Sequence, residues 1–530
     1  MALPTQPVRR RIVAILFALS AAGARLSCAE TGLPVHVIPA DVLEDKIRGG
    51  MLAQIIGNLN GLPHEMKYID EPGQIDRFTP SLPDGARTDD DTDLEWVYLH
   101  EIARGGKTLI PPKRIAELWK SHINRRIWCA NKYARRLFDL GFEPPWTGNE
   151  TFNPWSEFNI SGQFVCESFG LMAPAMPQTA ARIGLHYTRT TIDGEPAQTT
   201  QLFTTMIALA FIENDVDKLL DAGLTAVDPN SRTAEIVREV RAMCVANPDD
   251  WRKTRGEIKR RWQTHGGEMR DRNGYELNTA STIAALIYGQ RPAFVIDREG
   301  SNENSSAFVE TLRLAFNFGW DCDNNAATAA TIVGVMKGRR WMDSQGWRIA
   351  DIYRNTTRDK MPTDETLTSL ENKVIQCARI AIREQGGELT SNPTTSGNAQ
   401  PQSPPPTEGG DDHSNSAVYR ITTQSPANIE PLATARDQFV AARDHFLPRL
   451  ADDLSSAAPA NARAAYIAIC LDEAANLKRE NPAAWSAAIA ELARYKNLLD
   501  EMHKAPESVG IELREKARQA GLSMPLTKAN

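Results

Sequence analysis

Apolar residues recur at helical spacing through most of this chain, and that spacing limits the fold more than any other feature. Between Asp41 and Gln385, apolar residues lie three and four positions apart in segments such as EDKIRGGMLAQIIGNL, TTQLFTTMIALAFIENDVDKLLDAG and TAEIVREVRAMCV. This is the pattern of helices that bury one face. Runs of alternating β-branched residues, which are typical of strands, are few. We therefore predict a mainly helical domain over residues 41–385.

Two further regions follow this domain. Residues 386–416 read GGELTSNPTTSGNAQPQSPPPTEGGDDHSNS, which lacks a periodic apolar face and predicts a flexible linker. Residues 417–527 contain ATARDQFVAARDHFLPRL and AWSAAIAELARYKNLLDEMHKA, which predict a small bundle of amphipathic helices. We expect this C-terminal helical domain either to bind an unknown partner or to cover the first domain. A chain that ends near Gly386 is expected to fold.

The first 29 residues have the order of a secretory signal peptide. Arg9, Arg10 and Arg11 precede an apolar run over residues 12–24, and Ser-Cys-Ala then offers small residues for cleavage before Glu30. The run is too short to cross a bilayer comfortably, so we expect no transmembrane segment in the mature chain. The prediction is an exported protein, periplasmic or secreted, by a general or a twin-arginine route. A buried N-terminal helix is the alternative.

Charge and cysteine content exclude two further classes of protein. The net charge of −7 gives no basic field for nucleic acid, so no nucleic-acid partner is expected. The cysteines are scattered without a CxxC pair, which argues against a zinc site.

Two groups of acidic residues stand where helices are predicted to begin. One lies in TDDDTDLEWVYLHEI from Thr88, the other in GWDCDNNAATAATIVGVMKG from Gly319. At a helix N-terminus, the free N–H groups and the helix dipole stabilise negative charge. Either group alone is also explained as a solvated helix cap. If the two groups meet, four or five carboxylates share one pocket, and their repulsion demands hard cations such as Mg²⁺, most economically a pair.

Three segments together resemble the ADP-ribosylglycohydrolase family. DKIRGGMLAQIIGNLNGLPHEMKY, from Asp45, is similar to the opening helix of that family, with Glu65 at the family's Glu position and Asn58 where Asp is usual. The run Asp89-Asp90-Asp91-Thr92 resembles the family's T-D-D-T motif, and Gly319 to Asn324 resembles its last motif, G-x-D-x-D-T. The motifs occur in the family's order, over residues 41–342.

The resemblance implies an all-α domain with a two-magnesium centre that cleaves an N- or O-glycosidic bond of ADP-ribose, as in the dinitrogenase reductase-activating glycohydrolases. Mn²⁺ is a possible substitute. The metal ligands that it implies are Asp89, Asp90, Asp91, Asp321, Asp323 and Asn324. The catalytic residues that it implies are Glu65, as general base or ligand, with Asp91 and Asp321. We expect the aspartates to converge although about 230 positions separate them, and we expect Asp93 to tolerate replacement.

The middle of the chain departs from the family. NISGQFVCESFGLMAPAMP lacks the Arg of the family's Arg-Ile-x-Pro segment. Asn159, Gln163 and Glu167 lie four apart, so on a helix they would form one polar stripe that lines the pocket or faces solvent. The residues predicted to bind substrate are Gln163, Glu167, His186 and Trp320. For His186 and Trp320, a hydrogen-bonded histidine and a core aromatic are the structural alternatives.

Three functions are compatible with these features. The first is a metal-dependent glycohydrolase acting on a small-molecule or protein-linked ribosyl or ADP-ribosyl substrate. The second, favoured by the predicted export and the altered middle segment, is a glycosidase or nucleoside hydrolase of the same fold. The third, favoured by Asn58 and Asn324 at positions of usual ligands, is a non-catalytic binding module that contains metal.

Overall fold

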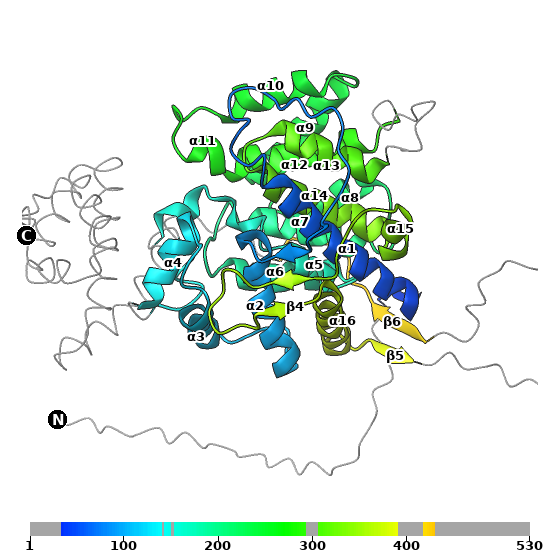
Figure 1. Ribbon diagram of the computed structural model, residues 1–530. Helices are drawn as coiled ribbons and strands as arrows, with labels where there is room; N and C mark the ends of the chain where they lie inside the picture. Colours follow the sequence, from blue (N-terminus) through cyan, green and yellow to red (C-terminus); the bar gives the residue numbers. More distant parts are fainter. Residues whose placement is uncertain (1–32, 140–141, 150–152, 293–305, 391–416, 430–530) are drawn as a thin grey trace, which may run out of the picture. The chain divides into compact units, whose positions relative to one another are not determined.

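The computed structural model of the protein describes residues 33–139, 142–149, 153–292, 306–390 and 417–429 (Figure 1). The predicted signal peptide, most of the predicted linker and the predicted C-terminal helices beyond residue 429 lie outside the described residues. Among the described residues, no helix combines the length and apolar character that crossing a membrane requires.

The described residues form sixteen α-helices and six short strands, and the prediction of an all-α fold is confirmed. The helices are α1 Ala40–Gly61, α2 Asp90–Gly105, α3 Pro112–His122, α4 Cys129–Asp139, α5 Glu167–Leu171, α6 Pro177–Thr188, α7 Gln198–Leu209, α8 Val216–Ala226, α9 Arg232–Ala246, α10 Trp251–Trp262, α11 Arg270–Asn273, α12 Tyr275–Gly289, α13 Ala307–Phe318, α14 Cys322–Lys337, α15 Arg339–Ser344 and α16 Leu367–Glu384. Two short 3₁₀ helices are η1 Pro154–Glu157 and η2 Ile160–Gly162.

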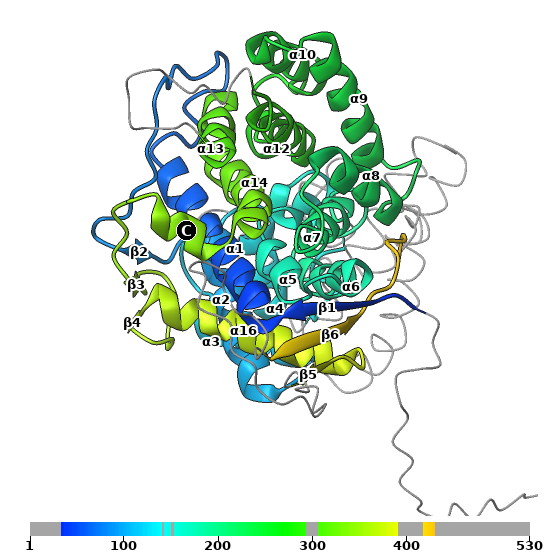
Figure 2. The ribbon, with the colours of Figure 1, turned by 90° about the vertical axis from the view of Figure 1, so that its right-hand side faces the viewer.

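Helices α1 and α14 form the central pair of the core, and both ribbon views show them side by side (Figures 1 and 2). Glycine lets their backbones touch: a Cβ on Gly57 would lie 2.5 Å from the carbonyl oxygen of Ala326. A Cβ on Gly61 would lie 2.4 Å from the Cα of Asp323. Neither approach is possible for a residue with a side chain. The end of α1 is therefore pressed against the first turn of α14.

A small sheet sets the entry to α2. Its strands are β2 Ala86–Arg87, β3 Tyr353–Arg354 and β4 Asp364–Glu365, with β2 parallel to β3 and β3 antiparallel to β4. After β3, Arg358 reaches back to α2 and pairs with Asp93, with 2.7 Å between Nη2 and Oδ1. Both side chains are fully buried. This burial argues against the expectation that Asp93 tolerates replacement, because this face of α2 is covered by residues that follow β3.

The other sheet crosses the predicted domain boundaries. Its strand order is β1-β6-β5, with β1 Val35–Pro39, β6 Val418–Thr422 and β5 Glu388–Thr390, all antiparallel. Strand β5 lies inside the predicted linker, and β6 lies inside the predicted C-terminal domain. Tyr419 and Ile421 of β6 are buried in the core. In the structure, β5 and β6 thus share a sheet with β1, although both strands lie beyond the predicted domain end at Gln385.

Candidate metal centre

The two acidic groups lie at the N-termini of α2 and α14, as their sequences predict. Helix α2 begins at Asp90, one residue after Asp89, and α14 begins at Cys322, one residue after Asp321. Because α1 holds the start of α14 in place, a residue of the turn after α1, Glu65, comes beside them. The three segments meet although they are far apart in the sequence.

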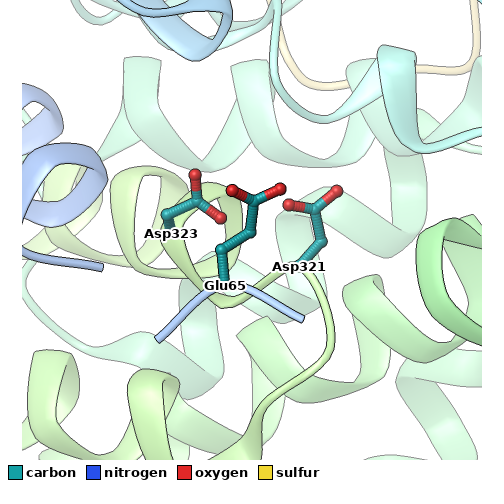
Figure 3. Close-up of side chains that lie close together, drawn as sticks. All are labelled: Glu65, Asp321 and Asp323. Atoms are coloured by element: carbon teal, nitrogen blue, oxygen red, sulfur yellow. The ribbon is translucent and has the colours of Figure 1, made fainter. Parts of the chain in front are cut away.

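Two groups of three carboxyl groups result. The ligand oxygens of Asp89, Asp91 and Asp323 lie within 4.8 Å of one another, and so do those of Glu65, Asp321 and Asp323. Figure 3 shows the carboxyl group of Glu65 between those of Asp321 and Asp323. Asp323 belongs to both groups. The structure therefore brings five of the predicted site carboxyls together in one continuous cluster.

Asp90 stands at the edge of this cluster, and among the described residues it belongs to neither group of three. Burial, then the charges of Asp89, Asp93 and Asp323, hold its pKa well above the usual range. The charges of the cluster therefore affect its pKa, but its carboxyl oxygens are not among the ligand atoms that converge.

The pKa values of the cluster are raised throughout. Burial, with the charges of Asp323 and Asp89, raises the pKa of Glu65 to about 7. Burial and the charge of Asp89 raise the pKa of Asp323 to about 6, and burial with the neighbouring carboxylates holds the pKa values of Asp91 and Asp321 well above their usual range. In the described part of the chain, no lysine or arginine pairs with Asp91, Asp321 or Asp323. Arg87 pairs with Asp89, with 3.3 Å between Nη1 and Oδ1, so the described residues balance only this edge of the cluster with a basic side chain.

Two carboxamides complete the first layer around the acids. The Nδ2 of Asn58 donates to Asp89 Oδ2 at 3.1 Å and to Asp91 Oδ2 at 2.9 Å, and the Nδ2 of Asn324 donates to Asp91 Oδ1 at 3.4 Å. The Oδ1 atoms of Asn58, Asn324 and Asp323 are buried and accept no hydrogen bond within the described residues. Burying an oxygen without a hydrogen-bond donor lowers the stability of the fold unless a cation or an ordered water binds to that oxygen.

Further amides fix Asp321. The Nδ2 of Asn273 donates to Asp321 Oδ2 at 2.5 Å, and Asn159 in turn donates to Asn273. The backbone N–H of Asp321 donates to Asn278 Oδ1 at 3.1 Å. The sequence gives no sign of Asn273 and Asn278, because they belong to the α11–α12 segment, which matches none of the three motifs.

A second pair of acids, Glu95 and Glu167, lies buried beside the cluster. The Nε2 of Gln54 donates to Glu95 Oε2 at 2.8 Å and to the Asp91 carbonyl at 3.2 Å, which joins the two layers. Burial raises the pKa of Glu167 to about 7, while burial and the charge of Glu167 hold the pKa of Glu95 well above its usual range. The motifs do not include Glu95, although its spacing of four from Asp91 puts both on one face of α2.

The predicted polar stripe of Asn159, Gln163 and Glu167 is wrong, because these residues do not share a helix. Asn159 precedes η2, Gln163 follows it, and Glu167 opens α5. All three are buried rather than solvated. Gln163 donates to Thr282 Oγ1 at 2.8 Å, and Glu167 accepts from the backbone N–H of Cys166 at 3.2 Å. The contacts of Gln163 and Glu167 lie within the core, whereas Asn159 donates to Asn273, which in turn donates to Asp321.

The other two residues predicted to bind substrate also contact protein. An imidazole nitrogen of His186, Nε2, lies 2.8 Å from the carbonyl oxygen of Ile110. Trp320 is fully buried, and its indole N–H donates to Gln263 Oε1 at 2.9 Å. The guanidinium of Arg255 covers the indole ring at 4.3 Å from its centroid. These contacts do not support a stacking role for Trp320.

A comparison with models of known families agrees with these motifs. A sequence model of the ADP-ribosylglycohydrolase family matches residues 39–376. Among solved structures, a chain described as an "ADP-ribosylglycohydrolase-related protein complex" is similar at 16% identity and a TM-score of 0.39, over 64% of this chain and 99% of that chain. No curated protein matches this chain.

Proposed function

This chain belongs to the ADP-ribosylglycohydrolase family, and we propose that it is a metal-dependent glycohydrolase that cleaves a ribosyl or ADP-ribosyl linkage. The observation that carries the proposal is the cluster of five carboxyl groups, in which Asp323 joins two groups of three. Carboxylates this close together are typical of a site for hard divalent cations. In the described part of the chain, no lysine or arginine pairs with Asp91, Asp321 or Asp323.

The residues present fit two Mg²⁺ ions, or Mn²⁺ ions in their place. The buried oxygens without hydrogen-bond donors, on Asp323 and Asn324, are the kind of ligand that these ions take. We assign the two sites to the two groups that share Asp323. The proposed ligands are Asp89, Asp91, Asp321, Asp323, Asn324 and Glu65, with Asp90 at the edge. When bound, the ions supply charge that neutralises the acids, binds a sugar diol and polarises the glycosidic bond.

Glu65 is the side chain that we assign to proton transfer. It is exposed, unlike Asp323 behind it, so it can reach a substrate. In the cation-free protein, burial and the neighbouring carboxylates raise its pKa to about 7; with the charge of the cations present, Glu65 would be ionised and able to accept a proton. Its carboxylate would take a proton from the attacking water at Oε. Asp321 is held in place by Asn273 and serves to orient the reacting groups.

A different substrate is the second candidate, and the middle segment favours it. The family's substrate-binding Arg is absent there, and Gln163 and Glu167 face the core instead. The protein would then be a glycosidase or nucleoside hydrolase that acts outside the cytoplasm. Export stays a prediction, since residues 1–32 lie outside the described residues. A non-catalytic module that contains metal is the third candidate.

One experiment separates these candidates. The purified protein is incubated with ADP-ribosyl-arginine, ADP-ribosyl-serine, ADP-ribose and simple nucleosides, each with Mg²⁺ and with EDTA. We expect Mg²⁺-dependent release of ADP-ribose or ribose from at least one ADP-ribosyl substrate, and its loss in Asp323→Asn. Cleavage of nucleosides alone would favour the second candidate. Tight Mg²⁺ binding without any cleavage would favour the third.

A further inference from the structure

Glu65 and Asp321 each lie in a turn with strained backbone, and a hydrogen bond joins the two turns. Met66, directly after Glu65, has φ of 54°, and Trp320, directly before Asp321, has φ of 58°. These left-handed conformations are unfavourable for residues with a side chain and persist only when the surroundings hold them. The backbone N–H of Met66 donates to the carbonyl oxygen of Trp320 at 2.9 Å. The position of Glu65 relative to Asp321 is thus set by this pair of turns.

Arg255 of α10 holds both turns. It is only 2% exposed, and its guanidinium donates to main-chain carbonyls on either side. On the Glu65 side, the acceptors are the carbonyl oxygens of Tyr68, Ile69 and Asp70, at 2.9, 2.8 and 3.0 Å. On the Asp321 side, the acceptor is the carbonyl oxygen of Phe318, at 3.3 Å, and the guanidinium also covers the ring of Trp320. One side chain therefore ties together two segments that are distant in the sequence.

Burying the charge of Arg255 is unfavourable, and the need to fill space in the core does not explain why an arginine stands here. Burial lowers its pKa to about 10 although the charges of Glu71 and Asp70 act to raise it, and among the described residues no carboxylate forms an ion pair with it. A buried charge without a carboxylate partner is unfavourable, and an apolar side chain of similar volume is often as stable. What an apolar side chain cannot do is donate several hydrogen bonds in fixed directions to two turns at once.

We propose that Arg255 is a positioning residue: by clamping the two turns, it holds Glu65 against Asp321 and Asp323 and so sets the cation affinity of that half of the cluster. The inference rests on the proposed function only in that the cluster binds divalent cations. Arg255 donates to the backbone of the turns and not to the acids, so it acts through the positions of Glu65 and Asp321. Lysine would keep the charge but lose the planar fork, so Arg255→Lys separates direction from charge.

The chain offers a control in Arg291, which makes similar contacts but is only half-buried. Its guanidinium also donates to main-chain carbonyls, those of Pro248 and Cys244, at 2.6 and 3.0 Å. It also covers an aromatic ring, that of Tyr288, at 4.5 Å. It lies just beyond the C-terminal end of α12, whereas Asn278, the α12 residue that contacts Asp321, is in the first turn. Arg291→Lys therefore makes the same chemical change away from the acids.

Calorimetric titration with Mn²⁺ alone tests the proposal in the full chain. We expect Arg255→Lys to weaken Mn²⁺ binding by about tenfold or more, which is the usual effect of losing an outer-shell partner. We expect Arg291→Lys to bind as the wild type does, even where its melting temperature falls equally. Equal affinity of Arg255→Lys and wild type, or equal weakening in both variants, overturns the role of Arg255. A wild-type protein that binds no Mn²⁺ overturns the proposed function as well.

Amide hydrogen exchange gives a second measurement that needs no cation. The N–H of Met66 is protected in the wild type by its bond to Trp320, and we expect Arg255→Lys to exchange it at least tenfold faster, while Arg291→Lys does not. If Arg255→Lys fails to fold, Trp320→Phe replaces it, because it removes the hydrogen bond to Gln263 and shrinks the ring under the guanidinium. Wild-type exchange and wild-type Mn²⁺ affinity in Trp320→Phe would then overturn the proposal.

Discussion

Asn58 donates a hydrogen bond from Nδ2 to Oδ2 of Asp91 at 2.9 Å, across the contact between α1 and α2. The same nitrogen reaches Asp89 at 3.1 Å. At this position the family usually has an aspartate, so the chain holds a neutral donor where a further acid would add to the repulsion. The amide partly offsets the negative charge of the group that contains Asp91.

Asn58→Asp should lower the stability of the cation-free protein and raise its affinity for cations. The added carboxylate removes two hydrogen bonds and increases repulsion, so we expect a lower melting temperature in EDTA than for the wild type. With Mg²⁺, the melting temperature should rise more steeply than that of the wild type, because tighter binding to the folded state adds stability. Asn60→Asp, which adds the same charge two residues further along α1, is the control. An Mg²⁺-induced shift no larger than in the wild type would count against this interpretation.

Asp323 should matter more than any other single ligand, because it belongs to both groups of carboxyl groups. We expect Asp323→Asn to weaken Mg²⁺ binding at both sites by at least about 100-fold, given that outer-shell partners alone are worth 10–100-fold. Asp321→Asn should affect one site and leave the other. Calorimetric stoichiometry measures the difference, with the exposed Asp84→Asn as the control. Equal loss of a single site in both variants would contradict the shared role.

The cation-free protein should lose stability as the pH rises from about 4.5 to 7. The pKa of Glu65 is raised from 4.5 to about 7, and that of Asp323 from 3.8 to about 6. In this window the folded state keeps protons that the unfolded chain has lost, so the free energy of unfolding falls with pH. Mg²⁺ should remove the part of this slope that comes from the cluster. Glu167 and Glu371, whose pKa values are also raised to about 7, should leave a remainder.

Melting curves at pH 5 and pH 8, in EDTA and in Mg²⁺, measure this slope. The expected order is the lowest melting temperature at pH 8 in EDTA and a clear recovery at pH 8 in Mg²⁺. A melting temperature in EDTA that rises between pH 5 and pH 8 would contradict the raised pKa values.

Asp93→Asn should be strongly destabilising. Its partner Arg358 would keep a buried charge without a counter-charge, which costs about 3–5 kcal/mol in the free energy of unfolding. Urea unfolding measures this loss. The double variant Asp93→Asn/Arg358→Met removes both charges and should recover much of it. A single variant as stable as the wild type would contradict the role of the pair.

The domain should require β6. A chain that ends at Gly386 lacks β5 and β6 and leaves β1 without a partner, whereas one that ends at Ile429 keeps the sheet. Loss of buried Ile421 alone removes about 2 kcal/mol of hydrophobic stabilisation. We expect the shorter chain to melt at a clearly lower temperature than the longer one, as measured by circular dichroism. Equal melting temperatures would support the boundary predicted from the sequence.

The sequence predicts what local patterns and family motifs determine. Helical spacing predicts α1 and α14, and acids before apolar stripes predict the helix starts at Asp90 and Cys322. It does not predict Asn273 or Arg255, because their hydrogen bonds join segments that only the folded chain brings together. The burial of Asp93 could not be predicted for a related reason. Whether its side of α2 faces solvent depends on where Arg358 packs. Strands of two to five residues, such as those of β1-β6-β5, carry too little alternation to be recognised.

The bond between Asn324 and Asp91 joins residues 233 positions apart, which has a consequence for the order of folding. Contacts between such distant residues form only after a long loop has closed, so the cluster is assembled late, once α14 has docked onto α1. A cation that needs both halves finds no site in the unfolded chain or in an early folding nucleus. Its binding energy is then absent from the transition state for folding. Mg²⁺ should therefore leave the folding rate nearly unchanged but slow the unfolding rate, because the ion stabilises the native state and not the transition state.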